Sequence, residues 1–139
     1  MIQEITKFIE SKTESFTIGT NLFMGHRPQE KPDQCVLVSE SVGGSPVPGL
    51  SDRQDKPIQV INRNASYLTA RADAYEIYDA IYKDHTLGSA GWELPVVTIG
   101  VEYEALVIIP IAAPQYIGQD ESGLYEFSTN YLFMIKDKE

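Results

Sequence analysis

Few side chains in this sequence have the types and spacing that catalysis or metal binding requires. The two histidines, His26 and His85, lie far apart in the sequence, and we expect each to be a surface residue. With the single cysteine, Cys35, they could in principle meet, but the Cys-x-x-Cys and His-x-x-x-His spacings typical of metal sites do not occur. We therefore expect no metal site, and we expect Cys35 to be a small buried hydrophobic residue on a strand.

Two acidic residues, Glu102 and Glu104, are the remaining candidates for acid–base chemistry. On a strand they would share one face and could exchange protons if buried, whereas the alternative is a solvated strand edge. Ser39, Ser41 and Ser45 lack the Gly-x-Ser-x-Gly turn of a nucleophile. Neither a phosphate loop nor a dinucleotide motif is present. The sequence therefore predicts no catalytic residue and no cofactor.

The length and composition predict one soluble domain over residues 1–139. A chain of 139 residues is long enough to bury one hydrophobic core without disulfides or metals, and 42% hydrophobic with 22% charged residues is ordinary for a globular protein. The longest apolar run, residues 105–113, is interrupted by Pro110 and is shorter than the roughly 20 residues of a spanning helix. The N-terminal residues lack the order of a secretory signal. We expect no membrane segment and no export.

The net charge of -9 disfavours nucleic-acid recognition, because the attraction to phosphates is absent over the molecule as a whole. Arg53, Lys56 and Arg63 could form a local basic stripe. However, Asp52 and Asp55 lie among them, and a mixed solvated surface is the favoured alternative.

Hydrophobic periodicity predicts two helices and several strands. Apolar residues three and four apart indicate an amphipathic helix over 2–12 and a second over 67–83, whose Ala70, Ala74, Ile77 and Ile81 share a face. Asn64 or Ser66 can cap the second helix, and Asp73 is expected in water. The predicted strands cover residues 16–24, 34–40, 57–63, 93–99, 103–113, 123–136 and a possible short segment at 115–117. This order predicts an α+β fold with a mixed, mainly antiparallel sheet packed by two α-helices.

Residues 41–56 are predicted to form a long loop, because three glycines and two prolines support neither a helix nor a strand there. A loop of that length in a small domain is usually either functional or disordered. Residues 120–123 instead predict a hairpin turn that ends in Gly123. The next strand carries Tyr125, Phe127, Tyr131 and Phe133 on one face, and tyrosines in excess of what the core can hold would suit a subunit interface.

Three stretches of the sequence carry a resemblance to a known family. They are Asp55-Lys-Pro-Ile-Gln-Val-Ile-Asn-Arg63, then residues 70–81, Ala-Arg-Ala-Asp-Ala-Tyr-Glu-Ile-Tyr-Asp-Ala-Ile, and finally residues 113–131, which begin Ala-Pro-Gln-Tyr-Ile-Gly. With the N-terminal helix, they resemble the minor capsid or tail terminator proteins of siphophages and prophages. The resemblance covers nearly the whole chain, but its stretches are structural signatures and not catalytic motifs.

The resemblance implies a structural virion protein that is assembled in the bacterial host cytoplasm. Such a subunit forms a ring, usually a hexamer, which docks on the last ring of the tail-tube protein, halts tube growth and meets the head connector. A closed ring needs two different patches on each subunit. We expect the loop to supply one of them, through the residues Val47, Leu50, Asp52, Arg53, Asp55 and Lys56.

Two other classes of protein share parts of this pattern. One is a neck or head-closure protein, which joins head and tail, and the other is a small hydrolase or binding domain. A hydrolase would need a pocket in which Cys35, His26 or Glu102 and Glu104 converge. No catalytic residue follows from the resemblance.

Overall fold

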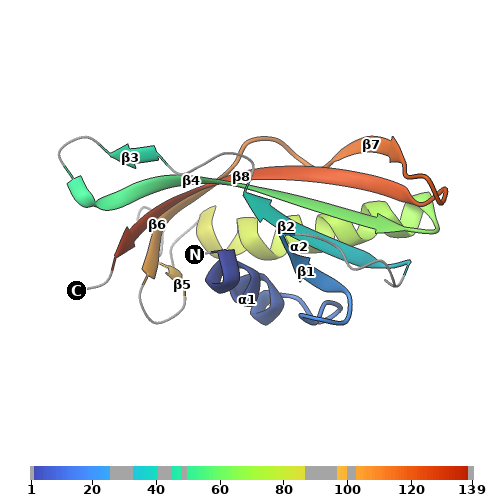
Figure 1. Cartoon of the computed structure of the whole chain (residues 1–139), viewed down its shortest axis with the longest axis horizontal. Coiled ribbons are helices and arrows are strands. Elements are labelled where there is room, and N and C mark those ends of the chain that lie inside the picture. The colour runs from blue at the N-terminus through green and yellow to red at the C-terminus, as the bar shows by residue number, and fades with distance from the viewer. Residues whose placement is uncertain are drawn as a thin grey trace.

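The computed structural model describes residues 2–25, 33–40, 45–47, 50–86, 97–99 and 103–137. Two helices lie on one side of a mixed, mainly antiparallel sheet, so the predicted α+β fold is confirmed (Figure 1). The described helices are α1 (Ile2–Lys12) and α2 (Tyr67–Thr86). The described strands are β1 (Leu22–Met24), β2 (Cys35–Glu40), β3 (Ser45–Val47), β4 (Leu50–Asn64), β5 (Val97–Ile99), β6 (Tyr103–Pro110), β7 (Gln115–Gln119) and β8 (Tyr125–Asp137).

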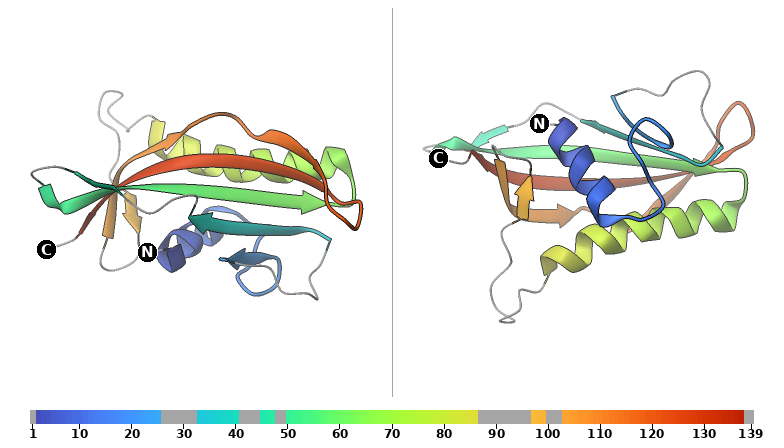
Figure 2. Two further views of the ribbon diagram at one scale, coloured as in Figure 1. Left: turned by 45° about the horizontal axis from the view of Figure 1, so that its top comes forward. Right: turned by 90° about the horizontal axis from the view of Figure 1, so that it is seen from below.

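Two long antiparallel strands, β4 and β8, form the centre of the sheet. They pair from Arg53 opposite Lys136 to Asn64 opposite Tyr125. The outer edge of β4 carries β2 and β3 one after the other, and the outer edge of β8 carries β7 and β6. β1 lies parallel to β2, and β5 lies antiparallel to β6. The result is an elongated body whose two ends are built differently (Figure 2).

The hydrophobic core lies between the helices and the sheet. Ile5, Phe8 and Ile9 from α1 and Ile77 and Ile81 from α2 belong to one buried cluster with residues of the central strands. The burial of aromatic side chains along β8 follows the sequence prediction: Phe127, Tyr131 and Phe133, all at odd-numbered positions, are buried. Ser128, which was expected on the other face, is buried as well.

The start of α2 is fixed by short-range hydrogen bonds. The side-chain oxygen of Ser66 accepts from the backbone N–H of Thr69 at 3.5 Å, and the side-chain amide of Asn62 on β4 donates to the carbonyl of Ala70 at 2.7 Å. Ala70 and Ala74 are buried, and their small side chains allow the helix to approach the sheet closely. The predicted second helix and its buried face are confirmed.

The turn between β7 and β8 is the predicted hairpin. The backbone N–H of Asp120 donates to the carbonyl of Leu124 at 2.9 Å, and Gly123 has φ +80°, a conformation that L side chains rarely adopt. A glycine is therefore needed at this position.

Replacement of Gly123 by alanine should lower the free energy of unfolding by about 1 kcal/mol, because a Cβ is unfavourable at positive φ. Nothing lies within 4 Å of the added Cβ, so the cost is conformational and not steric. Urea denaturation measures it. Ser122→Ala in the same turn is the control and should change stability by less than about 0.5 kcal/mol; equal losses in both variants would contradict the conformational explanation.

The largest errors in the predicted boundaries concern two stretches. Residues 50–56 do not belong to a loop but begin β4, because they pair with β3 on one side and, from Arg53 onward, with β8 on the other. The expected strand over 16–24 is reduced to β1, since the carbonyl of Thr17 accepts from the N–H groups of Thr20 and Asn21, and Gly19 has φ +87°. Parts of the predicted loop and of the predicted strand 93–99 lie outside the described residues.

Candidate subunit interface

The predicted interface residues lie at one end of the elongated body. We call β3 together with residues 50–56 of β4 the arm. Val47 and Leu50 are opposite each other in the pairing of β3 with β4, and Ser45 is opposite Asp55. The tip of the arm, where β3 lies beside the start of β4, extends beyond both helices (Figures 1 and 2).

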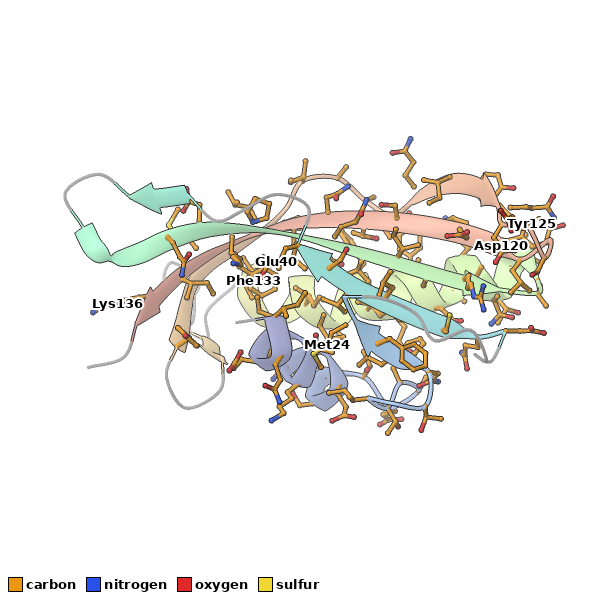
Figure 3. All side chains as sticks on the ribbon, viewed as in Figure 1. Met24, Glu40, Asp120, Tyr125, Phe133 and Lys136 are labelled. Carbon is orange, nitrogen blue, oxygen red and sulfur yellow. The ribbon has the colours of Figure 1, made fainter. Side chains whose placement is uncertain are left out.

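The register of β4 with β8 gives the positions of the charged residues 53, 55 and 56 of the arm. Arg53 and Asp55 are opposite Lys136 and Met134 of β8, whereas Lys56 is opposite Phe133 and so belongs to the helix-covered face. Lys56 forms an ion pair with Glu40, with 3.1 Å between Nζ and Oε1. Glu40 is labelled in Figure 3. Asp55 and Lys56, which are neighbours on β4, therefore lie on opposite faces of the sheet.

The residues proposed for chemistry do not form a site in the described part of the chain. Cys35 is fully buried on β2. Among the described residues, no group of three His, Cys, Asp or Glu side chains is arranged to hold a metal ion. His26 and Glu102 lie outside the described residues, and the side chains of His85 and Glu104 are not described.

Arg63 is not part of a surface basic stripe. Its side chain is only 3% exposed; it donates from Nε to the Cys35 sulfur at 3.0 Å and from Nη1 to Asp120 Oδ2 at 2.7 Å. Burial raises the pKa of Asp120, but hydrogen bonds from the backbone of Leu124 and Ser122 and from Arg63 outweigh it, so the pKa lies below its ordinary value. This ion pair joins the β7–β8 turn to β4.

Asp73 on α2 is a second polar residue that sequence analysis placed wrongly. It was expected in water, but it is only 8% exposed and accepts hydrogen bonds at 3.1 Å from the side-chain amides of Gln34 and Asn64. Helical periodicity could have found it, because Asp73 directly precedes Ala74 and follows Ala70 by three residues, on the edge of the buried face.

Four exposed apolar and aromatic residues gather at the end of the body opposite the arm. Tyr67 and Leu68 begin α2, and Tyr116 and Ile117 lie on β7. The rings of Tyr67 and Tyr116 meet at a centroid distance of 5.2 Å in an edge-to-face arrangement. We call these four residues the tyrosine patch. The sequence held one indication of these exposed residues, because residues 105–119 contain no charged side chain. Strand periodicity alone, however, assigns such residues to the core.

The sequence matches a known protein family over most of its length. A family model described as bacteriophage tail terminator protein matches residues 11–137. The chain belongs to the bacteriophage tail terminator family. The suspected resemblance is thereby confirmed, and the match includes the arm, the tyrosine patch and the central strands. A comparison with curated proteins gives no significant match.

Tail terminators are structural proteins, and membership of the family indicates a component of the phage virion. Among the described helices of this tail terminator, none combines the length and apolar character needed to cross a bilayer.

Proposed function

We propose that this protein works without catalysis, as a subunit of a ring, typically a hexamer, that caps the tail tube and joins it to the head connector. The match to the tail terminator family over residues 11–137 carries the proposal. The expected partners are further copies of the chain, the tail-tube protein and the head-connector protein.

The shape of the molecule supports a closed ring. Each subunit in a ring must offer two unlike patches, because the contact joins one surface to a different surface of the next copy. The arm is one such surface at one end of the central strands. The candidate interface therefore remains the residues Val47, Leu50, Asp52, Arg53, Asp55 and Lys56, now placed on β3 and β4.

Deletion of the gene tests the assignment as a terminator. Without a cap, tail tubes should grow to uncontrolled lengths and remain unattached to heads, which electron microscopy of infected-cell lysates measures. The competing role as a neck or head-closure protein predicts tails of normal length that lack heads. Supply of the intact chain from a plasmid should restore uniform tails attached to heads.

Replacement of Arg53 by glutamate tests the arm. Reversal of this charge at the proposed contact should lower the mass of the assembled species measured by light scattering, because charge complementarity fixes the register of a contact. Lys7→Glu on the exposed surface of α1 changes the net charge equally and should leave the mass unchanged. An unchanged mass for Arg53→Glu would remove Arg53 from the interface.

A further inference from the structure

Residues 111–123, which lead from β6 through β7 to the turn before β8, lie outside the hydrophobic core. We call this segment the flap. Each of its residues is exposed or half-buried, and burial resumes at Leu124. In Figure 1 the chain between β6 and β7 arches away from β8. Because the flap buries little apolar surface, the hydrophobic effect contributes less to its position than to those of β4 and β8.

The pairing of β7 with β8 is short and interrupted. The paired positions of β7 are 115, 116, 118 and 119, and the register shifts between Tyr116 and Gly118, where Gly118 has φ +119°. A bulge of this kind disrupts the ladder of hydrogen bonds. By contrast, β4 pairs with β8 from Arg53 to Asn64 without a shift. Short, exposed ladders are typical of segments that open before the whole fold does.

Two contacts hold the first half of the flap against the rest of the molecule. The backbone N–H of Ile111 donates to the carbonyl of Asn130 at 2.9 Å. The Tyr116 ring lies 5.2 Å from the ring of Tyr67 and 5.5 Å from that of Phe127, measured between centroids. Tyr116 is 42% exposed, and neutral contacts at the surface are individually weak.

The ion pair of Asp120 with Arg63 is the strongest contact at the other end of the flap. Asp120 Oδ2 lies 2.7 Å from Arg63 Nη1, and the two side chains are 16% and 3% exposed. A hydrogen bond between charged groups that are shielded from water is stronger than a neutral one at the surface. Asp120 Oδ1 accepts from the backbone N–H groups of Ser122 and Leu124 at 2.9 Å. One carboxylate therefore shapes the turn and fastens it to β4.

We propose that the flap opens as one unit while the rest of the fold stays closed, and that the ion pair of Arg63 with Asp120 is the latch that keeps it shut. Opening uncovers the buried ring of Phe127 and the edge of β8 that β7 occupies. The rest of the sheet is retained, because β4 still pairs with the other edge of β8. This inference goes beyond the proposed ring and does not depend on it.

The movement also divides the tyrosine patch. Tyr116 and Ile117 belong to the flap, whereas Tyr67 and Leu68 belong to α2. The latch thereby controls whether the four side chains form one surface. Any molecule that contacts both halves of the patch would stabilise the closed flap, because it binds the closed state better than the open one.

Hydrogen exchange of single amides, measured by NMR on the full chain, separates flap opening from global unfolding. At the two ends of the flap, the N–H groups of Ile111 and Asp120 are hydrogen-bonded to carbonyls outside it. Val60 lies in the centre of the sheet, where β4 has a partner strand on each side. After correction for intrinsic rates, the two flap amides should exchange roughly tenfold or more faster than Val60. Their rates should barely rise in low concentrations of urea, because local opening exposes little surface.

Two variants separate the latch from the core. Asp120→Asn removes the charge of the latch but keeps an oxygen for the turn, so it should speed exchange of the amides of residues 111 and 120 by a common factor of roughly tenfold or more. Ile77→Ala, in the core beneath α2, should speed exchange of Val60 and leave the flap amides unchanged. Glu121→Gln removes a charge from an exposed position of the same turn and is the matched control, with all three rates unchanged.

Each arm of the experiment can overturn the proposal. Flap amides with the protection and urea dependence of Val60, or flap amides that respond to Ile77→Ala, would show that the segment opens only when the whole protein unfolds. A response to Asp120→Asn at residue 120 without one at Ile111 would show that the turn frays alone. Unchanged rates at both positions would remove the ion pair as the latch. The wild type and Ile77→Ala decide whether the flap exists even if Asp120→Asn does not fold.

Discussion

Ile77→Ala is expected to lower the free energy of unfolding by about 3 kcal/mol, the typical cost of deleting a large aliphatic side chain from a packed core. Ile77 is 1% exposed and belongs to the same buried cluster as Ile81, Tyr131 and Phe133. Its position on α2 faces the strands that form the centre of the sheet, where the cavity left by the missing atoms could not be filled without movement of the helix.

The matched control for Ile77→Ala is Leu68→Ala on the same helix. Alanine is the better helix former in both variants, so the small gain in helix propensity is shared. Leu68 is exposed, and its loss should change stability by less than about 0.5 kcal/mol. Urea denaturation followed by circular dichroism gives both values. Similar losses in the two variants would mean that α2 is not held by its buried face.

Asp120→Ala should lower the free energy of unfolding by about 3 kcal/mol at neutral pH, because it removes the carboxylate oxygen that lies 2.7 Å from Nη1 of the buried Arg63. The same change removes the acceptor of the Ser122 and Leu124 backbone N–H groups in the β7–β8 turn. Asp120→Asn keeps an oxygen for these two backbone groups, but it removes the charge and replaces the oxygen that accepts from Arg63 by an amide N–H donor. It should therefore lower the free energy of unfolding by less than the alanine variant does, about 2 kcal/mol.

The effect of Asp120→Asn should depend on pH. The pKa of Asp120 is lower in the folded protein than in the unfolded chain, so ionised Asp120 stabilises the fold. That contribution is complete at pH values well above about 3.9, the ordinary pKa of aspartate, and is lost as the pH falls through the lower pKa of the folded state.

Urea denaturation of the wild type and of Asp120→Asn between pH 7 and pH 2.5 measures this dependence. The difference in the free energy of unfolding between the wild type and Asp120→Asn should shrink below about pH 4, because a protonated carboxyl and an amide are both uncharged. Glu121→Gln, at an exposed position of the same turn, should show little difference at neutral pH. A constant difference for Asp120→Asn at all pH values would show that the ion pair with Arg63 contributes no stability.

The elements predicted well from the sequence are those whose local pattern and tertiary environment agree. Helix α2 has a cap at Ser66, small and branched residues on one face, and a sheet against that face. The turn at Gly123 combines a side-chain acceptor, Asp120, with a glycine at positive φ. In each case the residues that indicate the element also make the contacts that stabilise it.

The arm and the Arg63 ion pair were missed because they depend on partners distant in sequence. Residues 50–56 have the composition of a loop, yet residues 53–56 pair with β8 at positions 133–136. Arg63 is the one charged residue between positions 57 and 70, and its partner is Asp120, in the turn before β8. Local composition carries no information about such pairings, since they form only when β8 is in place.

The unbroken pairing of β4 with β8 also has a mechanical consequence. The two strands are antiparallel, and their hydrogen bonds run perpendicular to the long axis of the body. A force that pulls the arm away from the β7–β8 turn therefore loads these bonds in shear, so that many must break together before the strands slide. A molecule held at its two ends would therefore transmit tension along its long axis with little stretching.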